Sequence, residues 1–214
     1  MAACGVHLPD DLPEGTLVHV GRNGEYLGCI TFEDELKPSA PYAIAALKQS
    51  GIRELVLLSG AHETAARQAA DQLGLNRFHA QLLPQQKVEH VETMLAQKAS
   101  GETLVFVGDG INDAPVLTRA DVGVAMGALG SDAAVEAADV VLMDDDPTKL
   151  ALAVRISRRT VGIARQNIVF ALGVKLLVLA LVALGVSGMW MAVFADVGVS
   201  VLAILNAMRA LKVK

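Results

Sequence analysis

The stretch Val107-Gly108-Asp109-Gly110-Ile111-Asn112-Asp113-Ala114-Pro115 decides the fold of this chain. The apolar run before it predicts a strand that carries Asp109 to its carboxyl end. Glycines on both sides of this carboxylate allow close approach of backbone and ligand, and Asp113 with Pro115 can begin a helix. A strand that is followed by acidic residues and then by a helix is typical of the ligand-binding edge of a parallel sheet.

Strand and helix patterns alternate on both sides of this stretch. We predict strands at 16–20, 26–31, 54–58, 103–107, 122–125 and 140–143, and helices at 40–49, 63–73, 85–98 and 133–138. This alternation predicts an α/β fold with a mostly parallel, doubly wound sheet whose site lies at the carboxyl ends of the strands. The first two strands are joined across Arg22-Asn23-Gly24, a hairpin signal, so we expect them to form a separate antiparallel element.

Two further positions, at the end of a predicted strand and the start of a predicted helix, offer groups that can bind phosphate. Ser59-Gly60 ends a strand and offers a hydroxyl and a free amide to a phosphoryl oxygen, while Lys87 at a helix start offers a positive charge. Carboxylates such as Asp109 suit magnesium, and amides at a helix start suit phosphate. The simpler alternative is a tight turn with a capping aspartate.

Two apolar segments of 19 residues, Ile168–Val186 and Met189–Ala207, follow the α/β part. Each makes a helix of about 28 Å, long enough to cross a bilayer core. Because only Ser187-Gly188 connects them, we expect an antiparallel transmembrane hairpin. The alternative is a buried helical pair in a large soluble protein. Basic residues flank the hairpin on both sides, which predicts cytoplasmic termini and an external Ser187 in a multi-pass membrane protein of the cytoplasmic or inner membrane: Arg158, Arg159, Arg165, Arg209, Lys212 and Lys214.

The charge distribution divides the chain in the same way. From Arg158 onward, seven basic residues and one acid give +6, whereas the preceding residues hold 11 bases and 22 acids and carry −11. An acidic front excludes nucleic acid as an expected partner. Cys4 and Cys29 are too few for a disulfide framework, and the five histidines show no metal-ligand spacing.

Each membrane segment contains a single charge, Lys175 in the first and Asp196 in the second. Helical rise places these two side chains at depths that a lysine stem can bridge. Gly198 and Ser200 leave space beside the carboxylate, and Asn206 adds a polar group. We therefore favour an intramembrane pair on a cation path, and the alternative is a snorkelling lysine in a structural ion pair.

The motifs together resemble the phosphorylation domain of P-type cation ATPases, which is built on the haloacid-dehalogenase (HAD) fold. The hydroxyl, lysine and aspartate occur in the order of the second, third and fourth motifs of HAD-type phosphotransferases. The tail, with its lysine in the penultimate helix and Asp196-Val197-Gly198 in the last, resembles pumps for zinc, cadmium and lead. Further matching strings are Asp34-Glu35-Leu36-Lys37, Leu83-Pro84, Gly108 to Pro115, Val122 to Gly127, Ser131 to Asp139 and Asn206-Ala207-Met208-Arg209.

The resemblance implies a role for each candidate residue. Asp109 would bind the catalytic magnesium, with Asn112 and Asp113 supporting the phosphorylation site, and Lys87 and Ser59 would hold the phosphoryl group. The glycines Gly60, Gly108 and Gly110 would admit the nucleotide-derived phosphate. Asp196 would bind the transported divalent metal, with Lys175 as a built-in counter-ion. Mg²⁺ and ATP are the implied cofactors, and the implied partners are the lipid bilayer, the metal ion and the rest of the pump in trans.

The resemblance also implies a division of the chain as the carboxyl-terminal portion of a pump. The expected parts are a nucleotide-binding remnant (1–33), a HAD-like phosphorylation domain (34–146), a stalk helix (147–166) and two transmembrane helices (167–186 and 189–210). The family's Asp-Lys-Thr-Gly-Thr nucleophile motif does not occur in these 214 residues, so we expect the chain alone to be inactive. Ser59-Gly60-Ala61 stands where the family has Thr-Gly-Asp.

Two alternatives remain open at this stage. The string Val140 to Thr148 places Asp144 after an apolar strand in an Asp-x-Asp-x-Thr pattern, which would make the chain a membrane-anchored HAD-type phosphatase. Against this, Asp146 before Pro147 is a good helix cap. The second alternative is a non-catalytic subunit or remnant of a pump.

Overall fold

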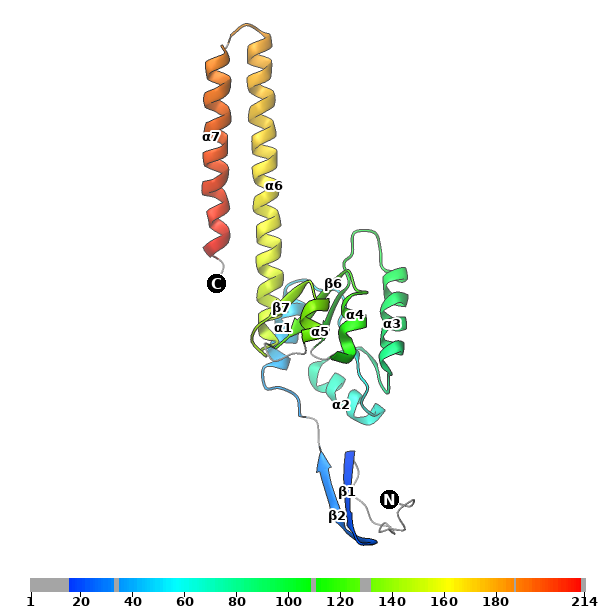
Figure 1. Ribbon diagram of the computed structural model, residues 1–214. Coiled ribbons are helices and arrows are strands. Elements are labelled where there is room, and N and C mark those ends of the chain that lie inside the picture. The colour runs from blue at the N-terminus through cyan, green and yellow to red at the C-terminus, as the bar shows by residue number, and fades with distance from the viewer. Residues whose placement is uncertain (1–15, 33–34, 109–110, 128–131, 187, 213–214) are drawn as a thin grey trace.

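The computed structural model describes residues 16–32, 35–108, 111–127, 132–186 and 188–212. Three parts follow one another along the chain, as Figure 1 shows: a β-hairpin, an α/β domain and a long helical hairpin. The elements in chain order are β1 (Thr16–Arg22), β2 (Glu25–Phe32), α1 (Ala40–Gln49), β3 (Val56–Leu58), α2 (Glu63–Leu73), β4 (Arg77–His79), α3 (Pro84–Gln97), β5 (Val105–Gly108), η2 (Ile111–Asp113), α4 (Ala114–Leu117), β6 (Val122–Met126), α5 (Asp132–Ala137), β7 (Val140–Leu142), α6 (Thr148–Ala183), α7 (Met189–Ala207) and η3 (Met208–Lys212).

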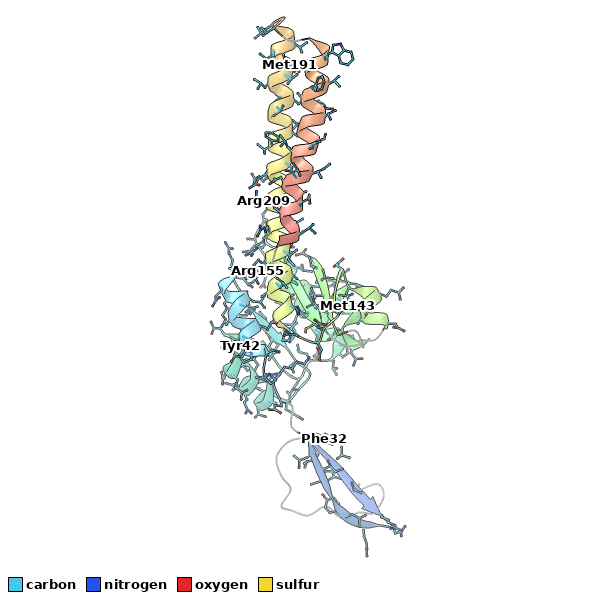
Figure 2. All side chains as sticks on the ribbon, turned by 90° about the vertical axis from the view of Figure 1, so that its left-hand side faces the viewer. Phe32, Tyr42, Met143, Arg155, Met191 and Arg209 are labelled. Atoms are coloured by element: carbon cyan, nitrogen blue, oxygen red, sulfur yellow. The ribbon has the colours of Figure 1, made fainter. Side chains whose placement is uncertain are left out.

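The first two strands form an antiparallel hairpin on their own, as predicted. Asn23 and Gly24 occupy its turn with φ of 50° and 84°, the left-handed backbone that Asn-Gly turns supply. The register shifts between Val20 and Gly21, so a bulge twists the strands. One apolar side of the hairpin is exposed, including Leu27 and Phe32, and Figure 2 shows Phe32 at its end.

The strands of the α/β domain are all parallel but do not form one continuous sheet. Within the described residues, β3 pairs only with β4, and β5, β6 and β7 form a second group in that order. One edge of β3 and one edge of β5 therefore have no partner strand among the described residues. The predicted doubly wound parallel sheet is confirmed in class but is divided, because no described strand bridges these two edges. The three-residue strand β4 was not predicted, since Arg77-Phe78-His79 has no apolar run.

The core of the domain lies between β6 and the helices that cover it. Leu117, Ala125 and Ala134 form its buried centre, with Phe106 and Val141 packed against them. Gly123 permits the close approach of β6 and α4, because a Cβ there would lie 2.5 Å from the Leu117 carbonyl oxygen. The packing thus fixes α4, and with it the loop that follows β5.

The domain continues into the helical hairpin without a break. Helix α6 runs for 36 residues from the domain to the far end of the hairpin, so the expected stalk and first apolar segment are one helix (Figure 1). Two helices, Thr148–Ala183 and Val193–Leu211, are long and apolar enough to cross a membrane, and their most apolar windows are not buried inside the structure. Within the described residues, the rest of the chain does not cover these two helices.

Candidate functional site

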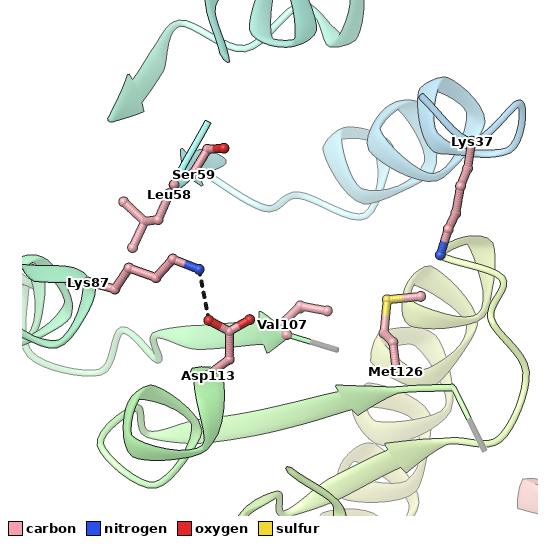
Figure 3. A pocket seen from close by; sticks show the side chains of 9 residues that line it. Lys37, Leu58, Ser59, Lys87, Val107, Asp113 and Met126 are labelled. Atoms are coloured by element: carbon pink, nitrogen blue, oxygen red, sulfur yellow. Dashed lines mark hydrogen bonds and ion pairs between the residues drawn. The ribbon is translucent and has the colours of Figure 1, made fainter. Parts of the chain in front are cut away.

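Five of the predicted site residues line one pocket at the carboxyl ends of β3 and β5. Its volume is about 330 Å³, and Figure 3 shows the side chains that line it. The strand ends contribute Ser59 and Gly108, helix α3 contributes Lys87 and the turn after β5 contributes Asp113. The remaining lining residues are Lys37, Leu58, Gly60, Val107 and Met126. The structure therefore brings Ser59, Gly60, Lys87, Gly108 and Asp113 together at one pocket.

An ion pair between Lys87 and Asp113 lies at the centre of this pocket. The Lys87 Nζ donates to Asp113 Oδ1 at 2.8 Å, and the side chains are only 17% and 12% exposed. Lys87 is positioned by the first turn of α3, where Pro84 starts the helix and Gln86 accepts a hydrogen bond from the Leu83 amide. A buried ammonium held by one carboxylate offers its remaining N–H donors to an anion in the pocket.

Gly108 makes room for the Asp113 carboxylate. A Cβ at position 108 would lie 2.8 Å from Asp113 Cβ, 2.9 Å from Asp113 Oδ2 and 3.0 Å from the Phe106 ring. Distances this short are not tolerated between non-bonded atoms, so only glycine fits here. The structure thus supplies the reason for the glycine that the sequence singled out.

Ser59 stands at the opposite wall of the pocket, at the end of β3. Its Oγ accepts a hydrogen bond from the Ala61 amide at 3.1 Å, and its own amide donates to the His79 carbonyl at 2.9 Å. The hydroxyl hydrogen remains available to a ligand oxygen. Gly60, next to it, is exposed.

Four residues that line the pocket were not predicted as site residues: Lys37, Leu58, Val107 and Met126. Lys37 reaches the pocket from the segment before α1, where its Nζ donates to Asp145 Oδ1 at 2.5 Å, and Met126 lines it at the end of β6. The string Asp34-Glu35-Leu36-Lys37 was a signal for the first of these. Lys37 brings a second positive charge to the pocket.

The remaining predicted residues of the phosphate site are not all placed beside it. Asn112 is exposed and does not line the pocket. Asp109 and Gly110 lie outside the described residues. Among the residues that are described, no group of three or more His, Cys, Asp or Glu side chains is arranged to hold a metal ion.

The acidic run after β7 is structural in this conformation. Asp146 accepts hydrogen bonds from the Thr148 amide at 3.0 Å and the Thr148 hydroxyl at 2.8 Å, which lower the pKa of its carboxyl, and it thereby caps α6. Asp144 is 67% exposed, lies 3.6 Å from Lys149 and does not line the pocket. The geometry does not support Asp144 as a nucleophile.

Lys175 and Asp196 lie on the helical hairpin, far along the chain from this pocket. Both side chains are exposed, and neither an ion pair nor a hydrogen bond joins them among the contacts of the described residues. Lys175 precedes the end of α6 by eight residues and Asp196 follows the start of α7 by seven, so both lie at nearly the same height on the hairpin.

Comparison with known proteins identifies the family. A family model described as haloacid dehalogenase-like hydrolase matches residues 7–121, more than half of the chain. The cadmium, zinc and cobalt-transporting ATPase of Bacillus subtilis is 52% identical over 208 residues, which are 96% of this chain and 30% of that protein. The zinc-transporting ATPase of Synechocystis is 53% identical over 198 residues, 92% of this chain and 27% of that protein.

Solved structures agree with the sequence matches. The crystal structure of a zinc-transporting PIB-type ATPase in an E2.Pi state superposes with a TM-score of 0.79 at 41% identity, over 92% of this chain and 31% of that one. This chain thus spans less than a third of each relative. It belongs to the haloacid dehalogenase-like hydrolase family, and over nearly its whole length it is similar to one part of heavy-metal-transporting P-type ATPases.

Proposed function

We propose that the chain is the phosphate-handling and metal-releasing portion of an ATP-driven efflux pump for divalent heavy metals such as zinc, cadmium and lead. The observation that carries the proposal is the joining of two sites by one helix. The pocket around Lys87 and Asp113 lies in the domain from which α6 rises, and the same helix carries Lys175. In this proposal, phosphoryl transfer at one end drives metal movement at the other.

At the phosphate end, the residues that line the pocket have separate tasks. Lys87 neutralises the transferred phosphoryl group, and the Ser59 hydroxyl donates to one of its oxygens. Lys37 supplies further positive charge from the opposite side of the pocket. The Asp113 carboxylate holds the Lys87 ammonium in place while the pocket is empty.

The nucleophile must come from a segment that these residues do not contain. Parallel strands β3 and β5 present unpaired edges, and their carboxyl ends both line the pocket. A parallel strand that pairs with both edges would complete the sheet and carry an aspartate at its end directly to Lys87 and Ser59. We therefore assign this place to the Asp-Lys-Thr-Gly-Thr segment of the pump, supplied in trans or by the same polypeptide.

In this proposal, magnesium and the phosphoryl group transferred from ATP occupy the same pocket. Magnesium prefers carboxylate oxygens, and Asp113 provides a carboxylate in the lining of this pocket. Asp109 and Asp113 would hold the ion, which would supply positive charge to the phosphoryl oxygens. The chain's own residues then orient that group and exclude competing water.

At the membrane end, Asp196 would ligate the transported ion and Lys175 would replace it. The lysine ammonium competes for the carboxylate with a departing cation, which favours release. The orientation in the bilayer follows from the arginines that flank the hairpin, so we place both ends of it at the cytoplasmic side. Arg155 and Arg209, labelled in Figure 2, mark this side.

A chimera tests the proposal. In the Bacillus subtilis cadmium, zinc and cobalt-transporting ATPase, the 208 matched residues are replaced by this chain, and zinc resistance is measured in a zinc-sensitive host. We expect resistance that is lost in Lys87→Ala and in Asp196→Ala and kept in Lys149→Ala, an exposed lysine outside the pocket. A chimera that is made in normal amount and inserted in the membrane but confers no resistance would contradict the proposal and favour a non-catalytic subunit.

A further inference from the structure

Two asparagines join the helices of the hairpin near its cytoplasmic end. The Asn206 Nδ2 on α7 donates to Asn167 Oδ1 on α6 at 2.8 Å, and the Asn167 Nδ2 donates to the Ala203 carbonyl at 3.0 Å. The Arg209 guanidinium donates to Asn206 Oδ1 at 2.9 Å. The amide of Asn206 is therefore engaged between the two helices.

The rest of the contact between the two helices is apolar. In α6 from Ala164 to Ala183, the half-buried residues are those that face α7: Asn167, Ala171, Val174, Val178 and Leu181. The facing residues with described side chains on α7 are Ala195, Val199, Ala203 and Asn206. Small and aliphatic side chains pack nearly as well when one helix slides by a turn, whereas paired amides in an apolar setting do not.

The register that the asparagines set brings Lys175 level with Asp196. Asn167 on α6 bonds to Ala203 and Asn206 on α7, so these residues lie at the same level. Lys175 lies eight residues further along α6. Because α7 runs in the opposite direction, the residues at the level of Lys175 lie eight positions earlier on α7, between 195 and 198. Because both helices rise 1.5 Å per residue, Asp196 falls within the matching interval. A slide of one turn would separate the two charges by about 5 Å along the axis.

The same register places the two charges on one flank of the hairpin. Lys175 directly follows Val174, and Asp196 directly follows Ala195, and both preceding residues face the other helix. Antiparallel helices turn in opposite senses when viewed along one direction, so the residue after a facing residue lies on the same flank in both. Because Lys175 and Asp196 lie at the same level and on the same flank of the hairpin, the lysine side chain can reach the carboxylate.

We propose that Asn167 and Asn206 are positioning residues for the metal site: they fix the helix register that keeps Lys175 opposite Asp196. Their connection to metal release rests on the proposed function, whereas the register itself does not. The pair acts through geometry alone and touches neither the ion nor the phosphate.

Disulfide trapping in the full chain tests the register. In lipid nanodiscs and a Cys4→Ser/Cys29→Ser background, the pair Val178→Cys/Ala195→Cys reports the observed register, and Val178→Cys/Val199→Cys reports a register shifted by one turn. We expect Asn167→Leu/Asn206→Leu to lower the ratio of the first cross-link to the second by about 3- to 20-fold, the range for one interhelical hydrogen bond in a membrane. Ser200→Ala is the matched control, because the Ser200 hydroxyl bonds only to Asp196 O in its own helix. An unchanged ratio in the double variant would overturn the proposal.

A second measurement directly detects contact between the Lys175 and Asp196 side chains. Dicyclohexylcarbodiimide couples an amine and a carboxyl in contact into an amide and takes up the water as a urea, so mass spectrometry can count joined Lys175 and Asp196. We expect coupling in the native chain and in Ser200→Ala, and a loss of about 3-fold or more in Asn167→Ala, which is less disruptive than the leucine pair. Equal coupling in Asn167→Ala would overturn the positioning role. Native coupling together with a chimera that confers no resistance would instead reject only the pump assignment.

Discussion

A single glycine, Gly108, makes room for the Asp113 carboxylate of the pocket. We predict that Gly108→Ala destabilises the domain by about 1 to 3 kcal/mol, the usual cost of overpacking, because the new Cβ meets Asp113 at 2.8 Å. Gly162→Ala in α6 is the control: it has open space around it and should be neutral or stabilise by up to about 1 kcal/mol. Urea unfolding measures both changes, and equal effects of the two variants would contradict the assignment.

The lysine of the pocket also stabilises the empty domain. Removing it in Lys87→Met leaves the Asp113 carboxylate buried without its partner, which we expect to cost about 3 kcal/mol. Lys149→Met breaks only an exposed contact of 3.6 Å and should cost less than about 0.5 kcal/mol. Adding Asp113→Asn to Lys87→Met should recover part of the loss. A double variant that is less stable than the single one would show that the burial of a lone charge is not the cause.

At the scale of elements, the start of α6 has a pH-dependent cap. Hydrogen bonds from Thr148 lower the pKa of Asp146 in the folded chain, so the cap contributes stability above the unfolded pKa of about 3.9 and loses it as the pH falls through the folded value. The Tm of Asp146→Ala should therefore lie below that of the native chain at pH 7, with the difference closing below about pH 4. Asp144→Ala, at an exposed position outside the cap, should show no such difference. A gap that widens in acid would refute the cap.

Most elements could be predicted because local pattern decides them. Helices α1 and α2 have the predicted bounds, and α7 matches the apolar segment residue for residue. Strand β4 could not be predicted, because its pairing with β3 comes from tertiary contacts and not from its own composition. Helix α6 joins the expected stalk (147–166) to the first apolar segment in one continuous helix.

The residues of the candidate site also divide into those that a local sequence pattern predicts and those that only tertiary contacts bring together. Ser59, Lys87, Gly108 and Asp113 follow from strand ends and helix starts, and the structure brings them to one pocket. Lys37 and Met126 join them through folding of distant segments, which a local pattern does not reveal. The interhelical use of Asn206 was hidden for the same reason, since a sequence does not say which helix a polar side chain faces.

At the scale of the whole molecule, the divided sheet leaves a place where a further parallel strand could bind between β3 and β5. Among the described residues, β3 and β5 each have one edge without a partner strand, while the core around Leu117 in the β5–β7 group is already packed. We predict that a peptide containing Asp-Lys-Thr-Gly-Thr within an apolar strand binds the chain and slows amide hydrogen exchange in β3 and β5, and not in the β1–β2 hairpin. A peptide with the same composition in scrambled order is the control. Protection confined to the hairpin, or equal for both peptides, would contradict the predicted strand site.

The central claim is that one continuous helix couples a phosphate site to a metal site. The most direct test is zinc uptake into inverted membrane vesicles that contain the chimera, started by ATP and followed with a zinc-sensitive dye. We predict ATP-dependent uptake that is abolished by Asp113→Ala at the phosphate end and equally by Asp196→Ala at the membrane end. Uptake that persists at the native rate when Asp196 is replaced would contradict the account.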